Sequence, residues 1–309
     1  MSVNRTLLVV GYGSLLSGYG LMAERRGGRS QLLARDAYPV IIENAARGLA
    51  KPSSHGQYLA MDLEPVDPTE PIKVRIARGG GDSPQVADGG EVGGLLLEFD
   101  AEWAARISTR EEYDSANFLR LLDIAERAGK PLAEYLLAIA QNAAFNLDAY
   151  RRELCAILGY TSPGYIFHPV PLDDGRVAIA AIGSGFHSSG HDEIISKRRE
   201  FNMAKLLTCE EALALTHLPM DREGQIGYFA ECLLGGVHGV AVGDLMANFD
   251  ADADWAADLA RHFHRAAAGE HERFLRATSL DEQSYLERFG DAPAPSLAPL
   301  LKLASDAQR

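Results

Sequence analysis

The sequence predicts an α+β fold, in which a small mixed β-barrel is followed by helices, and three observations lead to this prediction. The first hundred residues contain short apolar or alternating runs separated by clusters of Gly, Pro and Asp, which is the pattern of a small barrel or mixed sheet. From Ser115 onward the apolar residues recur at helical spacing. With 309 residues the chain is long for one small barrel. We therefore expect a barrel domain over 1–187 and a mostly helical region over 188–309.

Each expected element can be placed in order along the chain. Strands are expected at 6–10, 38–44, 57–63, 73–77, 93–99, 165–170 and 176–182. A helical pair over about 115–160 interrupts this series as an insertion, and its second helix is expected to run over 132–158. In the C-terminal region the periodicity predicts helices over 253–278 and 279–289. The glycine-rich stretch 79–90 is expected to form a loop.

Composition limits the class of partner and the compartment. The chain has 43 acidic and 30 basic residues and a net charge of −13, which argues against nucleic acid or an anionic membrane as the main partner. Its three cysteines, Cys155, Cys209 and Cys232, lie far apart, so we expect neither a disulfide framework nor a CxxC metal site, as in a reducing cytoplasm. The apolar stretch 226–246 includes charged residues that are costly in a bilayer, so no membrane-spanning helix is expected.

The feature most informative about function is the turn Gly11-Tyr12-Gly13-Ser14-Leu15, which follows an apolar strand near the N-terminus. Glycines at a strand end let bare backbone N–H groups approach a carboxylate or the oxyanion of a tetrahedral intermediate. A dinucleotide-binding motif would need a third glycine where Leu16 stands. A plain glycine turn that ends a buried strand is a second interpretation. Ser14 is not favoured as a nucleophile, because the G-x-S-x-G pattern is absent.

A second segment of the sequence, downstream of the turn, supports a third interpretation of the turn. The strand expected at 93–99 is followed by a short helix and then by Thr109-Arg110-Glu111-Glu112-Tyr113. The Tyr-Gly-Ser-Leu turn, together with this acidic segment, resembles the γ-glutamylcyclotransferase-like superfamily. The resemblance implies a barrel of that type with a single catalytic glutamate at Glu111, for which Glu112 is a rival. It also implies a set of substrate-binding residues, which are Tyr12, Gly13, Ser14, Leu15 and Arg47.

The same resemblance implies a reaction. The α-amine of a γ-glutamyl amide attacks its own γ-carbonyl, and 5-oxoproline and a free amine are released, with no metal and no cofactor. The expected partner is a small-molecule γ-glutamyl substrate. The helical insertion and the helical C-terminal part are large departures from a minimal member of the family, and we expect them to reshape substrate access or to form a homodimer interface. The alternative is a non-catalytic or biosynthetic small-molecule-binding member of the same fold that acts on an amino-acid amide.

Overall fold

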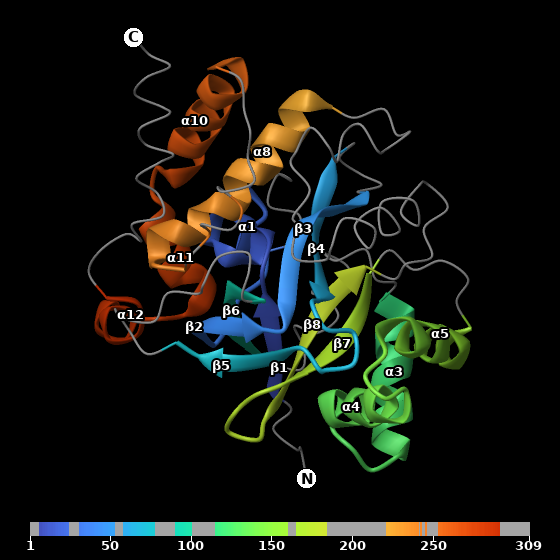
Figure 1. Cartoon of the computed structure of the whole chain (residues 1–309). Helices are drawn as coiled ribbons and strands as arrows, with labels where there is room; N and C mark the ends of the chain where they lie inside the picture. The colour runs from blue at the N-terminus through green and yellow to red at the C-terminus, as the bar shows by residue number, and fades with distance from the viewer. Residues whose placement is uncertain are drawn as a thin grey trace.

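The chain has an α+β structure in which a curled sheet lies between two groups of helices, as a computed structural model shows (Figure 1). The structure describes residues 6–24, 31–52, 58–77, 90–100, 115–159, 165–183, 221–240, 242, 245 and 253–290. The expected class of fold is therefore confirmed. The expected boundary between 187 and 188 lies outside the described residues and stays a prediction.

The seven strands expected from the sequence are all present, and the part of the chain that the structure describes includes one further strand that was not expected. The strands are β1 (Thr6–Gly11), β2 (Asp36–Glu43), β3 (Ala45–Pro52), β4 (Leu59–Pro65), β5 (Lys73–Ile76), β6 (Glu91–Asp100), β7 (Tyr165–Pro171) and β8 (Val177–Gly183). The missed strand is β3, whose Ala-Ala-Arg-Gly sequence shows neither alternation nor β-branched residues. It pairs with β4 in a separate two-stranded sheet.

The six other strands form one mixed sheet in the order β5-β2-β6-β1-β8-β7. β1 pairs antiparallel with β6 and parallel with β8, so it lies in the interior of the sheet. The sheet curls into a half-barrel, and an isolated bridge between Val74 on β5 and Leu172 after β7 joins its two edges. Apolar side chains from β1, β6 and β8 fill its core.

Apart from two short helices that follow β1, the described helices fall into an inserted group and a C-terminal group (Figure 1). The inserted group is α3 (Ser115–Arg127), α4 (Leu132–Asn142) and α5 (Leu147–Leu158). The C-terminal group is α8 (Arg222–Leu233), the 3-10 helix η4 (Leu234–His238), α10 (Ala253–Ala267), α11 (Glu270–Thr278) and α12 (Glu282–Phe289). No helix within the described ranges combines the length and the hydropathy needed to cross a bilayer.

Two helices expected to be continuous are each broken, and the prediction was wrong at these points. The helix expected over 132–158 is two helices, because Ala144 and Phe145 have φ of 50° and 56°. The helix expected over 253–278 ends at Ala267, and Gly269 then takes a φ of 70° before α11 begins. Apolar periodicity continues across both breaks, so it does not signal the change of direction.

Candidate functional site

The Tyr12–Leu15 turn lies at the end of β1, inside the protein. Tyr12 is buried, and its hydroxyl donates a hydrogen bond to the carbonyl of Ala181 on β8. The 3-10 helix η1 (Ser14–Leu16) follows, closed by a 3.0 Å hydrogen bond from the N–H of Leu16 to the carbonyl of Gly13. The structure therefore confirms a tight turn at the end of a buried strand. The kind of ligand that this turn could bind is inferred from the residues around it.

Gly13 is packed tightly against β4 and α8. A Cβ atom at this position would lie 2.9 Å from Cβ of Met61 and 3.1 Å from the hydroxyl oxygen of Tyr228. The Tyr228 hydroxyl is fixed there, because it accepts a 2.9 Å hydrogen bond from the N–H of Met61. Its ring also stacks on Tyr58, with 4.7 Å between the ring centroids. Burial raises the pKa of Tyr228 well above its usual value, so this hydroxyl stays protonated.

The turn leaves two backbone N–H groups open. Gly13 and Leu15 are both buried. Within the described part of the chain, neither N–H donates a hydrogen bond to a protein acceptor. Buried backbone N–H groups are nearly always paired with protein, water or ligand. Two such donors in one turn are suited to binding an anionic oxygen.

Arg47 lies behind this turn on β3 and is fully buried. Its guanidinium donates hydrogen bonds of 3.1 Å to the carbonyl of Tyr12 and of 2.9 Å to the carbonyl of Gly93 on β6. Both contacts tie the turn to the sheet beside it. Arg47 therefore holds the carbonyl side of the turn, and its expected contact with substrate stays a prediction.

The two candidate acids, Glu111 and Glu112, lie outside the described residues. The preceding strand β6 ends at Asp100, which pairs with Thr6 at the far end of β1 from the turn. Glu111 follows Asp100 by eleven positions in the sequence, and such a segment can span about 36 Å when extended. The six residues of β1 cover only about 20 Å. The segment is therefore long enough to bring Glu111 back to the turn.

A second polar group lies on the other face of the β3–β4 hairpin, where sequence reasoning expected no functional residue. Its members are all buried, and they are Lys51, Asp62, Glu64 and Arg151. Arg151 on α5 donates hydrogen bonds of 2.8 Å to Glu64 and of 2.9 Å to the carbonyl of Gly183. The N–H of Gly183 in turn donates a 2.8 Å hydrogen bond to Asp62. These contacts join the hairpin to the inserted helices and to the end of β8.

The electrostatics of this cluster favour a structural role. Burial acts to lower the pKa of Arg151, but the carboxylates of Glu64 and Asp62 outweigh it and hold the pKa above its usual value. Burial, together with the charge of Arg151, lowers the pKa of His168 on β7 to about 3. His168 is therefore neutral at physiological pH. A buried arginine paired with a carboxylate, beside a neutral histidine, is typical of a network that joins elements of the fold.

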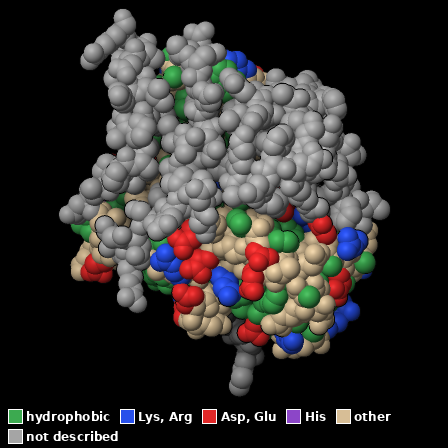
Figure 2. Space-filling model, in the orientation of Figure 1, with side chains coloured by type: hydrophobic (Ala, Val, Ile, Leu, Met, Phe, Trp, Pro, Cys, Tyr) green, Lys and Arg blue, Asp and Glu red, His purple; other side chains and the backbone are tan. Residues whose placement is uncertain are grey.

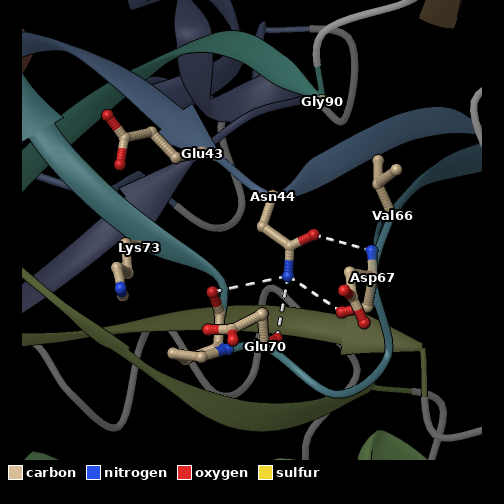
Figure 3. Close-up of a pocket in the computed structure, with 8 residues that line it drawn as sticks. Glu43, Asn44, Val66, Asp67, Glu70, Lys73 and Gly90 are labelled. Carbon is tan, nitrogen blue, oxygen red and sulfur yellow. Dashed lines mark hydrogen bonds between the residues drawn. The ribbon is translucent and has the colours of Figure 1, made fainter.

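A shallow pocket of about 310 Å³ lies elsewhere, at the corner between β2 and β3 (Figure 3). Asn44, at a φ of 52°, forms this corner. Its side-chain oxygen accepts a 2.7 Å hydrogen bond from the N–H of Asp67. Its side-chain nitrogen donates hydrogen bonds of 3.0 Å and 2.8 Å to the carbonyls of Asp67 and Glu70. The side chain at the centre of the pocket is therefore used to fix a loop.

A metal site would be a further candidate within the described ranges. No group of three or more His, Cys, Asp and Glu side chains is placed there to hold a metal ion. On the face drawn in Figure 2 the described acidic and basic side chains are interspersed. Comparisons with family models, with curated proteins and with solved structures give no match to this chain. The functional assignment therefore depends on the Tyr12–Leu15 turn and its surroundings.

Proposed function

We propose that the chain is a γ-glutamylcyclotransferase-like enzyme, with a barrel of that type, that cleaves a γ-glutamyl amide into 5-oxoproline and a free amine. The observation that carries the proposal is the pair of buried, open N–H groups of Gly13 and Leu15. In this proposal they hold the α-carboxylate of the substrate or the oxyanion that develops on its γ-carbonyl oxygen. One such donor to an oxyanion contributes about 3 kcal/mol to transition-state stabilisation.

The nucleophile in this reaction is the α-amine of the substrate itself. Glu111 takes a proton from the α-ammonium, and the amine nitrogen then attacks the γ-carbonyl carbon to close a five-membered ring. The bond from that carbon to the leaving nitrogen breaks as Glu111 returns the proton to this nitrogen. Glu111 then takes the second proton from the ring nitrogen and passes it to the departing amine, which leaves as an ammonium ion. Atoms and charges balance without water or a cofactor. Because both reacting groups belong to one molecule, the protein has little positioning entropy to supply.

The neighbours of the turn then have supporting roles. Tyr12 anchors the turn to β8 through its hydroxyl, and Arg47 anchors it to β6 through the carbonyl of Gly93. Ser14 contributes to the turn through its backbone in this proposal. Tyr228 and Met61 keep the space beside Gly13 closed to any side chain. The result is a rigid donor pair, which is what stabilisation of a developing charge requires.

The proposal is tested with a panel of γ-glutamyl amides and peptides, including glutathione, with 5-oxoproline detected by mass spectrometry. Wild-type protein and the Glu112→Gln variant should release 5-oxoproline. The Glu111→Gln variant should release it about a thousandfold more slowly, with an unchanged circular dichroism spectrum. Loss of activity in Glu112→Gln alone would move the catalytic role by one residue. No 5-oxoproline from any substrate would contradict the proposed activity.

A further inference from the structure

The short helix α1 (Gly18–Leu21), which follows the turn, is capped by a side chain from the C-terminal helices. Glu270 is the first residue of α11 and is 1% exposed. One of its carboxylate oxygens accepts a 2.6 Å hydrogen bond from the N–H of Gly18, and the other accepts a 2.9 Å hydrogen bond from the N–H of Tyr19. The first two N–H groups of α1 are thus bound by a residue about 250 positions later in the chain.

Glu270 is itself held by the buried His238, which is in turn held by Tyr285. Nε2 of His238 lies 3.0 Å from the carboxylate, and Nδ1 of His238 lies 2.9 Å from the hydroxyl of Tyr285. Because burial lowers the pKa of His238, its ring is neutral. Since the carboxylate can only accept, the ring proton is on Nε2, and Nδ1 accepts from the Tyr285 hydroxyl. The imidazole also stacks on Phe274, with 3.8 Å between the ring centroids. The carboxylate therefore has one defined position.

Contact between α1 and the turn is direct. A Cβ atom on Gly20 would lie 1.7 Å from the carbonyl oxygen of Ser14, so the backbone of α1 packs against the backbone of the turn. On its other side, a Cβ atom on Gly18 would lie 2.3 Å from the backbone nitrogen of Phe274 on α11. With backbone in contact on both sides, a shift of α1 cannot be absorbed by side chains alone.

We propose that Glu270 is a positioning residue for the Tyr12–Leu15 turn: through α1 it sets where the N–H groups of Gly13 and Leu15 lie. The part of this inference that concerns catalysis rests on the proposed function, whereas the part that concerns geometry does not. The C-terminal helices are then part of the substrate site, although they contribute no atom to the reaction.

The sequence permits a sharp test of this inference. It contains two Tyr-Gly pairs, Tyr12-Gly13 and Tyr19-Gly20, so protein labelled with ¹³C-carbonyl tyrosine and ¹⁵N-glycine gives one selected amide signal for each pair. Glu270→Gln replaces one acceptor oxygen by an NH₂ group and should shift both signals. It should also lower kcat about tenfold to a hundredfold, with a smaller change in KM. Glu272→Gln, at an exposed position of the same helix, should change neither.

The outcomes separate the inference from the proposed function. A Glu270→Gln variant that moves the Gly20 signal but keeps the Gly13 signal and kcat of wild type would overturn the positioning role. If Glu270→Gln does not fold, Tyr285→Phe removes one hydroxyl from the same network and should shift the Gly13 signal by a smaller amount. An unmoved Gly13 signal in Tyr285→Phe would equally overturn the inference. Wild-type protein without activity would contradict the proposed function, while the shift of the Gly13 signal would still test the positioning role.

Discussion

The turn after β1 and the corner after β2 are both sharp reversals at strand ends, but they differ in how their polar groups are hydrogen-bonded. At the corner, the amide of Asn44 bonds to backbone groups of Asp67 and Glu70, although the region is open to solvent. At the turn, the carbonyls of Tyr12 and Gly13 accept hydrogen bonds, whereas the N–H groups of Gly13 and Leu15 have no acceptor among the described residues, although the region is buried. The difference is that the polar groups of the corner are used to hold the fold, whereas two donors of the turn are not, and this is why the proposed site is placed at the turn.

The largest effect is expected from Arg47→Met, which removes the support of the turn. The substitution leaves the buried carbonyls of Tyr12 and Gly93 without this donor. We expect the free energy of unfolding to fall by about 2–5 kcal/mol, since each unsatisfied buried group costs roughly 1–3 kcal/mol. Urea denaturation measures the change. A loss below about 1 kcal/mol would mean that the turn does not depend on Arg47.

The Gly13→Ala substitution tests the side of the same turn that carries the N–H groups of Gly13 and Leu15. The added methyl group must displace Met61 or Tyr228, and the displacement moves the donor pair. We expect kcat/KM for the best γ-glutamyl amide to fall about a hundredfold, equivalent to about 2.7 kcal/mol. Asn44→Ala is the control, because it alters the corner and should keep kcat/KM. A folded Gly13→Ala variant with the kcat/KM of wild type would remove Gly13 from the site.

His168 tests whether a buried polar atom without a hydrogen-bond partner must belong to a functional site. Its Nδ1 has no hydrogen-bond partner within the described ranges, yet we assign it no role. Its pKa is about 3 in the folded state and near 6.5 when unfolded, so below pH 6.5 the unfolded state binds the extra proton and stability falls. From pH 7 to pH 5 the loss should be about 2 kcal/mol. Equal slopes of stability against pH for wild type and His168→Phe would contradict this account.

The smallest expected effect is the difference between two substitutions at the corner itself. Asn44→Gly keeps a residue that tolerates a positive φ and removes the hydrogen bonds of the side chain, so it should cost about 1–2 kcal/mol of stability. Asn44→Ala should cost about 1 kcal/mol more, because alanine resists the φ of 52°. Thermal or urea denaturation compares the two variants. Alanine as stable as glycine at this position would show that the backbone conformation does not matter.

Much of the fold could be predicted from local pattern, because strands and helices leave a period in the sequence. The seven strands with alternating or apolar runs were found in this way. β3 was missed because Ala45-Ala46-Arg47-Gly48 has no such period. Its partner β4 shows a clear alternation, and that pattern would place Asp62 and Glu64 on a solvent face. Both are buried, because Arg151 from a helix about ninety residues later pairs with Glu64 and β8 covers Asp62.

The candidate site was predictable only in part. The turn was visible because its glycines and tyrosine follow a strand directly. The residues around it, such as Tyr228 and Glu270, come from helices more than 200 residues away, and no local signal ties them to Gly13. Gly13 needs a glycine because of Met61 and Tyr228, which is a tertiary cause. Sequence alone therefore located the turn but not the surroundings that hold it.

The central claim is that the open N–H of Gly13 binds the γ-glutamyl group. The most direct measurement is a titration of the Glu111→Gln variant, labelled at its two Tyr-Gly pairs, with a γ-glutamyl amide that it cannot turn over. The account predicts a saturable shift of the Gly13 amide signal to lower field, as expected when an N–H donates to an anionic oxygen, and a smaller shift for Gly20. Saturation with no movement of the Gly13 signal, or no saturable binding at all, would contradict the account.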